Sequence, residues 1–110
     1  MWPGEISEPW QITRGNDATL TINVAAGGVA AALPPDGWHC HWRYMPSSDE
    51  HIVVTVDTSQ AAQGQLILRL AADQTATMRR DGVFDVLHVP TRRTWVRGAT
   101  ALMGSVTRDV

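Results

Sequence analysis

Apolar and polar side chains alternate along much of the chain, in short runs that turn-forming residues separate. Leu20, Ile22 and Val24, for example, alternate with threonine and asparagine. The same spacing recurs at residues 38–44, 51–57, 65–70 and 83–89. Because successive side chains of a strand point to opposite faces, this period of two predicts strands with one buried face. Strands at roughly ten-residue spacing, without long helical periods, are typical of a sandwich or barrel.

We therefore expect one all-β domain over residues 1–110, an antiparallel β-sandwich of about seven or eight strands. Residues 94–97 and 101–107 are expected to form two late strands, interrupted at Gly98. Residues 71–80 lack the alternation and are expected to hold at most one short helical turn that connects two strands. Residues 1–9, which are rich in proline, are expected to form an extended N-terminal arm.

The clearest amphipathic strand is residues 38–44, Trp-His-Cys-His-Trp-Arg-Tyr. Its even positions place three aromatic side chains and the cysteine on one face, and its odd positions place two histidines and an arginine on the other. The first face is expected to be core and the second to face solvent. The apolar positions of residues 51–57 predict an antiparallel partner for this strand.

Composition narrows the classes of partner. The net charge of −2 argues against a general affinity for phosphate backbones, so nucleic acid is not an expected partner. No apolar run approaches the ~20 residues of a membrane helix, and the N-terminus lacks the basic and apolar regions of a secretory signal. The single cysteine, Cys40, excludes an internal disulfide, and a chain of this length can bury a core without one.

No catalytic signature stands out, so we expect neither an enzyme nor a bound cofactor. Cys40 lies between two tryptophans on an apolar face, where a thiol behaves as a small buried hydrophobe. His39 and His41 share one face, and with His51 on the next strand they offer an alternative, a zinc site. This alternative lacks a fourth ligand, and two solvent-facing histidines on a sheet explain the pattern equally well.

Five tryptophans in a small domain suggest a binding surface. An exposed tryptophan beside arginine is typical of protein interfaces, and aromatic platforms also hold sugars. For the first two tryptophans a second interpretation stays open, in which they close one end of the sandwich. The interface hypothesis comprises Trp2, Ile6, Trp10, Arg93, Trp95 and Arg97.

Several segments together resemble a known family. They are the Ile-Thr-Arg-Gly-Asn-Asp stretch of residues 12–17, the alternating leucines 66, 68 and 70 followed by Gln-Thr-Ala at 74–76, the Gly-Val-Phe-Asp-Val of 82–86, and the closing Arg-Gly of 97–98 and Val-Thr-Arg of 106–108. From residue 8 to residue 110 the chain resembles the β-sandwich domain of actinobacteriophage virion proteins, the LtfC-type domain. It has a looser likeness to the N-terminal domains of phage baseplate upper proteins.

The resemblance implies a virion structural protein, a minor tail or adaptor subunit that assembles with other virion proteins and with copies of itself. It carries no family active site. Two alternatives stay open at this point. The chain could be a capsid decoration or minor capsid protein, or it could be a carbohydrate-binding module whose partner is a host cell-wall glycan.

Overall fold

The computed structural model describes residues 4–5, 8–26, 29–30 and 32–104. Two residues of the predicted interface, Trp2 and Ile6, lie outside the described residues. The strands are β1 (Gly4–Glu5), β2 (Trp10–Thr13), β3 (Ala18–Asn23), β4 (Ala25–Ala26), β5 (Val29–Ala30), β6 (Trp38–Arg43), β7 (His51–Asp57), β8 (Gln65–Leu70), β9 (Gly82–His88) and β10 (Arg93–Met103). The helical turns are η1 (Ala61–Gln63), α1 (Ala72–Thr75) and η2 (Val89–Thr91).

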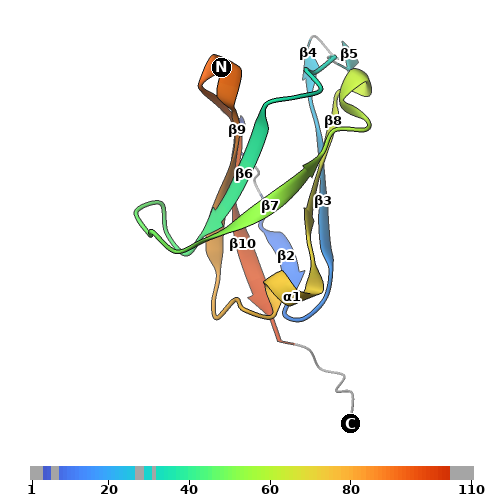
Figure 1. Ribbon diagram of the computed structural model, residues 1–110. Coiled ribbons are helices and arrows are strands. Elements are labelled where there is room, and N and C mark those ends of the chain that lie inside the picture. The colour runs from blue at the N-terminus through green and yellow to red at the C-terminus, as the bar shows by residue number, and fades with distance from the viewer. Residues whose placement is uncertain (1–3, 6–7, 27–28, 31, 105–110) are drawn as a thin grey trace.

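Eight of the strands form one sheet, in the order β1-β10-β9-β6-β7-β8-β3, with β2 also paired to β10. The pairs are antiparallel, except that β1 and β2 run parallel to β10. The sheet curls until it is nearly closed, like a barrel (Figure 1). The all-β class, the mainly antiparallel pairing and the single α-helical turn are confirmed, whereas a sandwich of two separate sheets is not. No helix in the described part of the chain is long and apolar enough to cross a membrane.

Strand β7 turns the sheet around the core. Its first half pairs with β6, from Arg43 opposite His51 to Cys40 opposite Val54. Its second half pairs instead with β8, beginning with Thr55 opposite Arg69. The chain thus passes from one side of the barrel to the other within a single strand.

The apolar and polar side chains that alternate in the sequence point to the inside and the outside of the barrel, respectively. Trp38, Cys40 and Trp42 are buried and Tyr44 packs against them, so the predicted core face of this strand is confirmed. The opposite face carries His39, which is exposed, and His41 and Arg43, which are partly exposed. The antiparallel pairing of β6 with β7 is also as predicted.

Strand β10 corrects the prediction of two late strands. It continues through Gly98, which lies opposite Phe84 on β9, and its irregularity falls earlier, between Thr94 and Val96. Gly98 does not break the strand because β9 pairs with it and with the residues before and after it, Arg97 and Ala99. Residues 105–107, which were also expected in this strand, lie outside the described residues.

Candidate functional site

The outer face of β6, β9 and β10 carries a charged row formed by residues that are far apart in the sequence. His41 is opposite Asp85, and Asp85 is opposite Arg97 on the next strand. Their neighbours along each strand, such as Trp42 and Val86, are buried, so these three side chains point outward. Side chains opposite one another on one face of a sheet are close enough to interact.

A second row lies directly beside the first, two residues along each strand. It consists of Arg43, Val83 and Ala99, again opposite one another. The two rows form a small array with arginines at opposite corners, Arg43 on β6 and Arg97 on β10. Ordinary strand geometry separates the α-carbons of these corners by about 12 Å.

This array is hollowed into a groove of about 470 Å³. The groove is low along β10 because Ala99 has a small side chain, and longer side chains surround it. The lining consists of His41, Arg43, Pro46, Val83, Phe84, Asp85, Arg97, Gly98 and Ala99.

Two arginines line the groove. Arg97 is exposed and has no hydrogen bond or ion pair with any side chain that the structure describes. Arg43 is held at one end, because its guanidinium donates to the backbone carbonyls of Ser48 and Asp49. Two acidic residues lie in register with Arg97, Asp85 on β9 and Glu5 on β1, so the two arginines are matched by two acidic positions.

His41 is partly buried and close to other cations. Burial, then the neighbouring His51, then Arg43 and His39 lower the pKa of His41 below its usual value, and Asp85 opposes them. The lowered pKa favours the neutral ring near pH 7.

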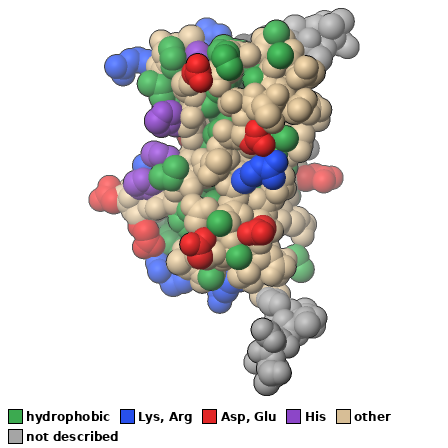
Figure 2. All heavy atoms as spheres, turned by 45° about the vertical axis from the view of Figure 1, so that its right-hand side comes forward, with side chains coloured by type: hydrophobic (Ala, Val, Ile, Leu, Met, Phe, Trp, Pro, Cys, Tyr) green, Lys and Arg blue, Asp and Glu red, His purple; other side chains and the backbone are tan. Residues whose placement is uncertain are grey.

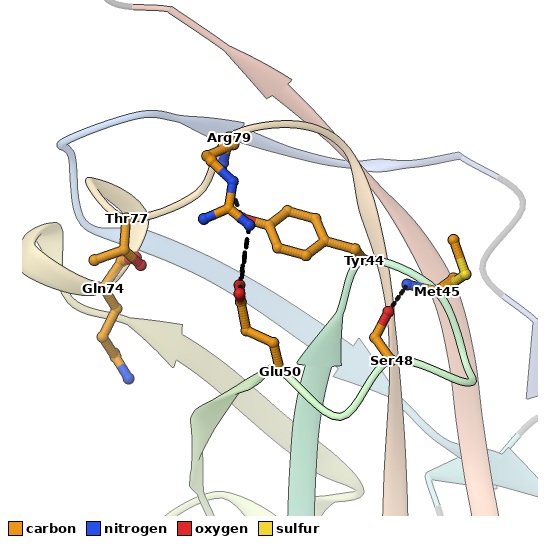
Figure 3. Close-up of polar contacts among 7 residues, drawn as sticks. All are labelled: Tyr44, Met45, Ser48, Glu50, Gln74, Thr77 and Arg79. Atoms are coloured by element: carbon orange, nitrogen blue, oxygen red, sulfur yellow. Dashed lines mark hydrogen bonds and ion pairs between the residues drawn. The ribbon is translucent and has the colours of Figure 1, made fainter.

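The wall formed by Pro46 is fixed by contacts to a distant loop. The backbone N–H of Arg79 donates to the Tyr44 hydroxyl at 3.1 Å, and the Arg79 guanidinium pairs with Glu50 at 3.2 Å. Figure 3 shows Arg79 beside the ring of Tyr44 and reaching Glu50 across the loop. The guanidinium of Arg80 also lies over the Tyr44 ring, 4.9 Å from its centre. These contacts tie the β6–β7 loop, which carries Pro46, to the segment before β9.

The three histidines proposed as an alternative zinc site are brought together only in part. The rings of His41 and His51 stack with centroids 4.5 Å apart and an angle of 28° between their planes. Stacked rings do not direct their nitrogens at one point, as ligands of a single ion must. In the part of the chain that the structure describes, no group of three or more His, Cys, Asp or Glu side chains could hold a metal. Histidine side chains gather along one side of the molecule in Figure 2.

The structure buries some of the predicted interface residues and leaves others exposed. Trp10 is 4 % exposed and packs edge-on against Phe84, so it belongs to the core and offers no surface to a partner. Buried and exposed side chains alternate along β2, and Trp10 lies on its inner face. Trp95 is half-buried with its ring edge against Trp38. Arg93 and Arg97 are exposed, and their role in an interface stays a prediction.

Cys40 is 1 % exposed, and burial, with a smaller contribution from Asp85, raises the pKa of its thiol. A buried thiol with a raised pKa is a poor nucleophile.

The groove itself was missed by reasoning from the sequence. The alternation identified the outer face of β6, but only the pairing register reveals that Asp85 and Arg97 share it.

No family model matches the chain, and no curated protein matches its sequence. The likeness to the actinobacteriophage virion domain therefore rests on the sequence motifs alone.

Proposed function

We propose that this protein is a non-catalytic structural subunit of a phage virion, a minor tail or adaptor protein that works by binding its neighbours. The observation that carries the binding role is the groove on the outer face of β6, β9 and β10, with its exposed Arg97. The motif resemblance supplies the virion setting, and with it the location in the assembled particle.

The chemistry of the groove supports recognition over reaction. Its lining combines two arginines, a histidine and an aspartate with small apolar side chains, and it includes no serine, threonine or cysteine. Cys40, which lies on β6, points to the opposite face and is buried. Charged groups around an apolar floor are typical of sites that bind and orient a partner.

The proposal includes the finer fold assignment, a flattened β-sandwich. In this interpretation β3, β8 and the second half of β7 form one layer, and the remaining strands of the sheet form the other. The switch of β7 from β6 to β8 supports it, because strands that pass between layers form the corners of such folds.

The carbohydrate-binding alternative receives less support from the geometry. Sugar-binding platforms need an exposed aromatic face, and of the tryptophans that the structure describes, Trp10, Trp38 and Trp42 are buried. Trp95 remains the candidate for such a platform. Loss of glycan-array binding on Trp95→Ala would favour that alternative, and an array without signal would remove it.

The proposed function is tested by locating the protein in particles. Phage purified from the source culture would be separated into heads and tails and analysed by mass spectrometry. Enrichment of this chain with tails, in fixed proportion to the major tail protein, is the expected result. Enrichment with heads would indicate a decoration or minor capsid protein, and absence from both fractions would refute the virion role.

A further inference from the structure

We propose that strand β3 pairs with the β3 strand of a second copy of this chain, antiparallel and about a two-fold axis at Thr21. The sheets of the two copies then continue into one another. This inference rests on the proposed function for its setting, because it names the surface through which an assembly subunit contacts a copy of itself.

Strand β3 lies at one end of the sheet and has one free edge. Among the strands that the structure describes, β3 pairs with β8 alone, and the preceding strand, β2, pairs with β10 instead. Figure 1 shows β3 along the right-hand side of the barrel. The free edge of a strand presents a row of backbone N–H and C=O groups, and another extended chain can pair with them.

The register with β8 identifies the backbone groups on this edge. In an antiparallel pair, every second residue exchanges hydrogen bonds with the residue opposite, and the residues between direct their groups away. The backbone N–H of Val24 donates to the carbonyl oxygen of Gly64 at 2.8 Å, and this pair continues the register of β3 with β8. Steps of two back along the strand therefore assign the even-numbered residues to β8. The residues that direct their N–H and C=O groups to the free edge are Thr19, Thr21 and Asn23.

The sequence of β3 does not protect its edge against pairing. Proteins commonly protect an edge strand with a charged side chain, a proline or a bulge. Strand β3 reads Ala-Thr-Leu-Thr-Ile-Asn, without charge or proline, and its register with β8 is unbroken. The edge is therefore suited to receive another strand.

A second copy is the occupant that matches this edge. With the axis at Thr21, the backbone groups of Thr19 meet those of the partner's Asn23, and Thr21 meets itself, so each outward N–H and C=O has a counterpart. The two exposed Thr21 side chains then lie opposite one another on the outer face, where threonine pairs can hydrogen-bond. Because β3 carries no charge, the two-fold axis brings no like charges together within the strand.

Leu20 supports the same arrangement from the inner face. It lies between Ala18 and Ile22, which are 9 % and 5 % exposed, but it is itself only partly buried. In the proposed register Leu20 is opposite the partner's Ile22, in a pair that exchanges no backbone hydrogen bonds and whose side chains are therefore close together. Pairing thus covers apolar surface that a single copy leaves in contact with water, which favours association.

The contact is small, so the isolated dimer is expected to be weak. Six residues from each copy compare with roughly 20–30 residues a side in a typical stable complex. In a particle that holds several copies, weak contacts act together and gain avidity.

The test measures association of the purified full chain as its concentration rises. Sedimentation velocity would follow monomer and dimer, and hydrogen exchange measured by NMR would follow individual amides. We expect the dimer to increase with concentration, and the amides of Thr19, Thr21 and Asn23 to become protected with it. The amides of Leu20 and Ile22, which already bond to β8, should change little and serve as internal controls.

Two substitutions at the axis test the register. Thr21→Lys and Thr21→Glu each place a charge opposite the same charge in the second copy, so each should weaken dimerisation about tenfold or more. An equimolar mixture of the two variants brings opposite charges together and should restore a dimer. The matched control is Thr55→Lys, which adds a charge at an exposed threonine of β7, away from the free edge. This control should dimerise like the original chain, and unchanged thermal melting would show that all three variants fold.

Several results would overturn the proposal. A chain that stays monomeric up to its solubility limit would do so without any variant. Fast exchange of the Thr21 amide in the dimer would place the contact on another surface, and protection of this amide in the monomer would show that the edge is already covered. Equal weakening by Thr21→Lys and Thr55→Lys, or a mixture of the two Thr21 variants that stays monomeric, would contradict the axis at Thr21.

The fractionation of particles fails separately from this test. Absence from virions would refute the proposed function and leave a measured dimer of the purified chain in place. A monomeric chain that is found with tails would refute the pairing of β3 and leave the proposed function in place.

Discussion

A single hydroxyl inside the barrel satisfies two buried donors. The Oγ1 of Thr100, a residue that is 3 % exposed, accepts hydrogen bonds from the indole Nε1 of Trp42 at 2.8 Å and from the backbone N–H of Gly82 at 3.0 Å. These bonds join β6, β9 and β10 beneath the groove. The polar side chain is therefore part of what fixes the register of the outer face.

Replacing Thr100 by valine keeps the shape and removes the acceptor. Each of the two buried donors left without a partner costs about 1–3 kcal/mol, so Thr100→Val should lower the free energy of unfolding by about 2–6 kcal/mol. Urea unfolding measures this change. Thr100→Ser keeps the hydroxyl and should lose clearly less, and a serine variant as unstable as the valine variant would contradict the explanation.

The stacked histidines make a second prediction at the residue scale. Because His51 is one of the groups that lower the pKa of His41, His51→Asn should raise that pKa toward its usual value. Burial, Arg43 and His39 would still lower it, and Asp85 would still raise it. An NMR titration of the His41 ring measures the change, and an unchanged or lower pKa would show that the stack has no electrostatic effect.

The lowered pKa of His41 also determines how the stability of the fold changes with pH. A histidine whose pKa is lower in the folded state than in the unfolded state binds its proton less readily when folded. The contribution of His41 to stability is therefore fully present above its unfolded pKa, and it is lost as the pH falls through the folded pKa. The variant that raises the folded pKa should show a weaker loss over this range.

At the scale of elements, the start of β9 depends on a glycine. A Cβ built on Gly82 would lie 2.5 Å from the Trp42 ring and 2.5 Å from the carbonyl oxygen of Arg43. Since the contacts include backbone, β9 cannot take a side chain here without moving away from β6. We expect Gly82→Ala to cost about 1–3 kcal/mol or more in the free energy of unfolding.

Thermal melting checks this expectation, with Gly104→Ala as the matched control. A Cβ at Gly104 meets nothing within 4 Å, so that variant should melt close to the original chain. Equal melting temperatures for the two alanine variants would mean that the close approach of β9 to Trp42 is not needed for stability.

In the β6–β7 loop we expect one substitution to increase local mobility without changing the stability of the fold. The ion pair between Arg79 and Glu50 is exposed, and exposed pairs contribute about 0–1 kcal/mol, so Arg79→Ala should scarcely change the free energy of unfolding. The loop should nevertheless loosen, and hydrogen exchange should accelerate in residues 45–50. Exchange at the original rate would show that the loop is held without Arg79.

The elements that the sequence predicted share one property, a regular alternation within a short stretch. This holds for β6, β7, β8 and β9, and for the helical turn placed where the alternation stops. The parallel pairing of β2 with β10 was not predictable in the same way, because alternation shows which face of a strand is buried and not which strand lies beside it. Gly98 and Gly82 show a related limit, since the role of a glycine depends on what approaches it.

At the scale of the whole molecule, one part of the candidate site was predictable from the sequence and another part was not. The histidine face of β6 was predicted from the sequence, and it lies on the outside of the barrel. The groove needs three strands in one register, which places Asp85 and Arg97 beside His41. No local pattern contains that information. Trp10, one of the predicted interface residues, is buried for the opposite reason, because the curled sheet has enough interior to hold its ring.

The pairing of β2 with β10 also bears on the order of folding. It places Trp10 opposite Thr100, so the barrel closes only by joining segments from distant parts of the chain. Such closure carries a large entropic cost, and contacts of long sequence separation slow folding. During synthesis on the ribosome β2 must wait for its neighbour, with its inner-face tryptophan still uncovered. Nascent chains stalled before β10 leaves the exit tunnel should accordingly remain sensitive to protease and bind chaperones, and chains released beyond it should become resistant.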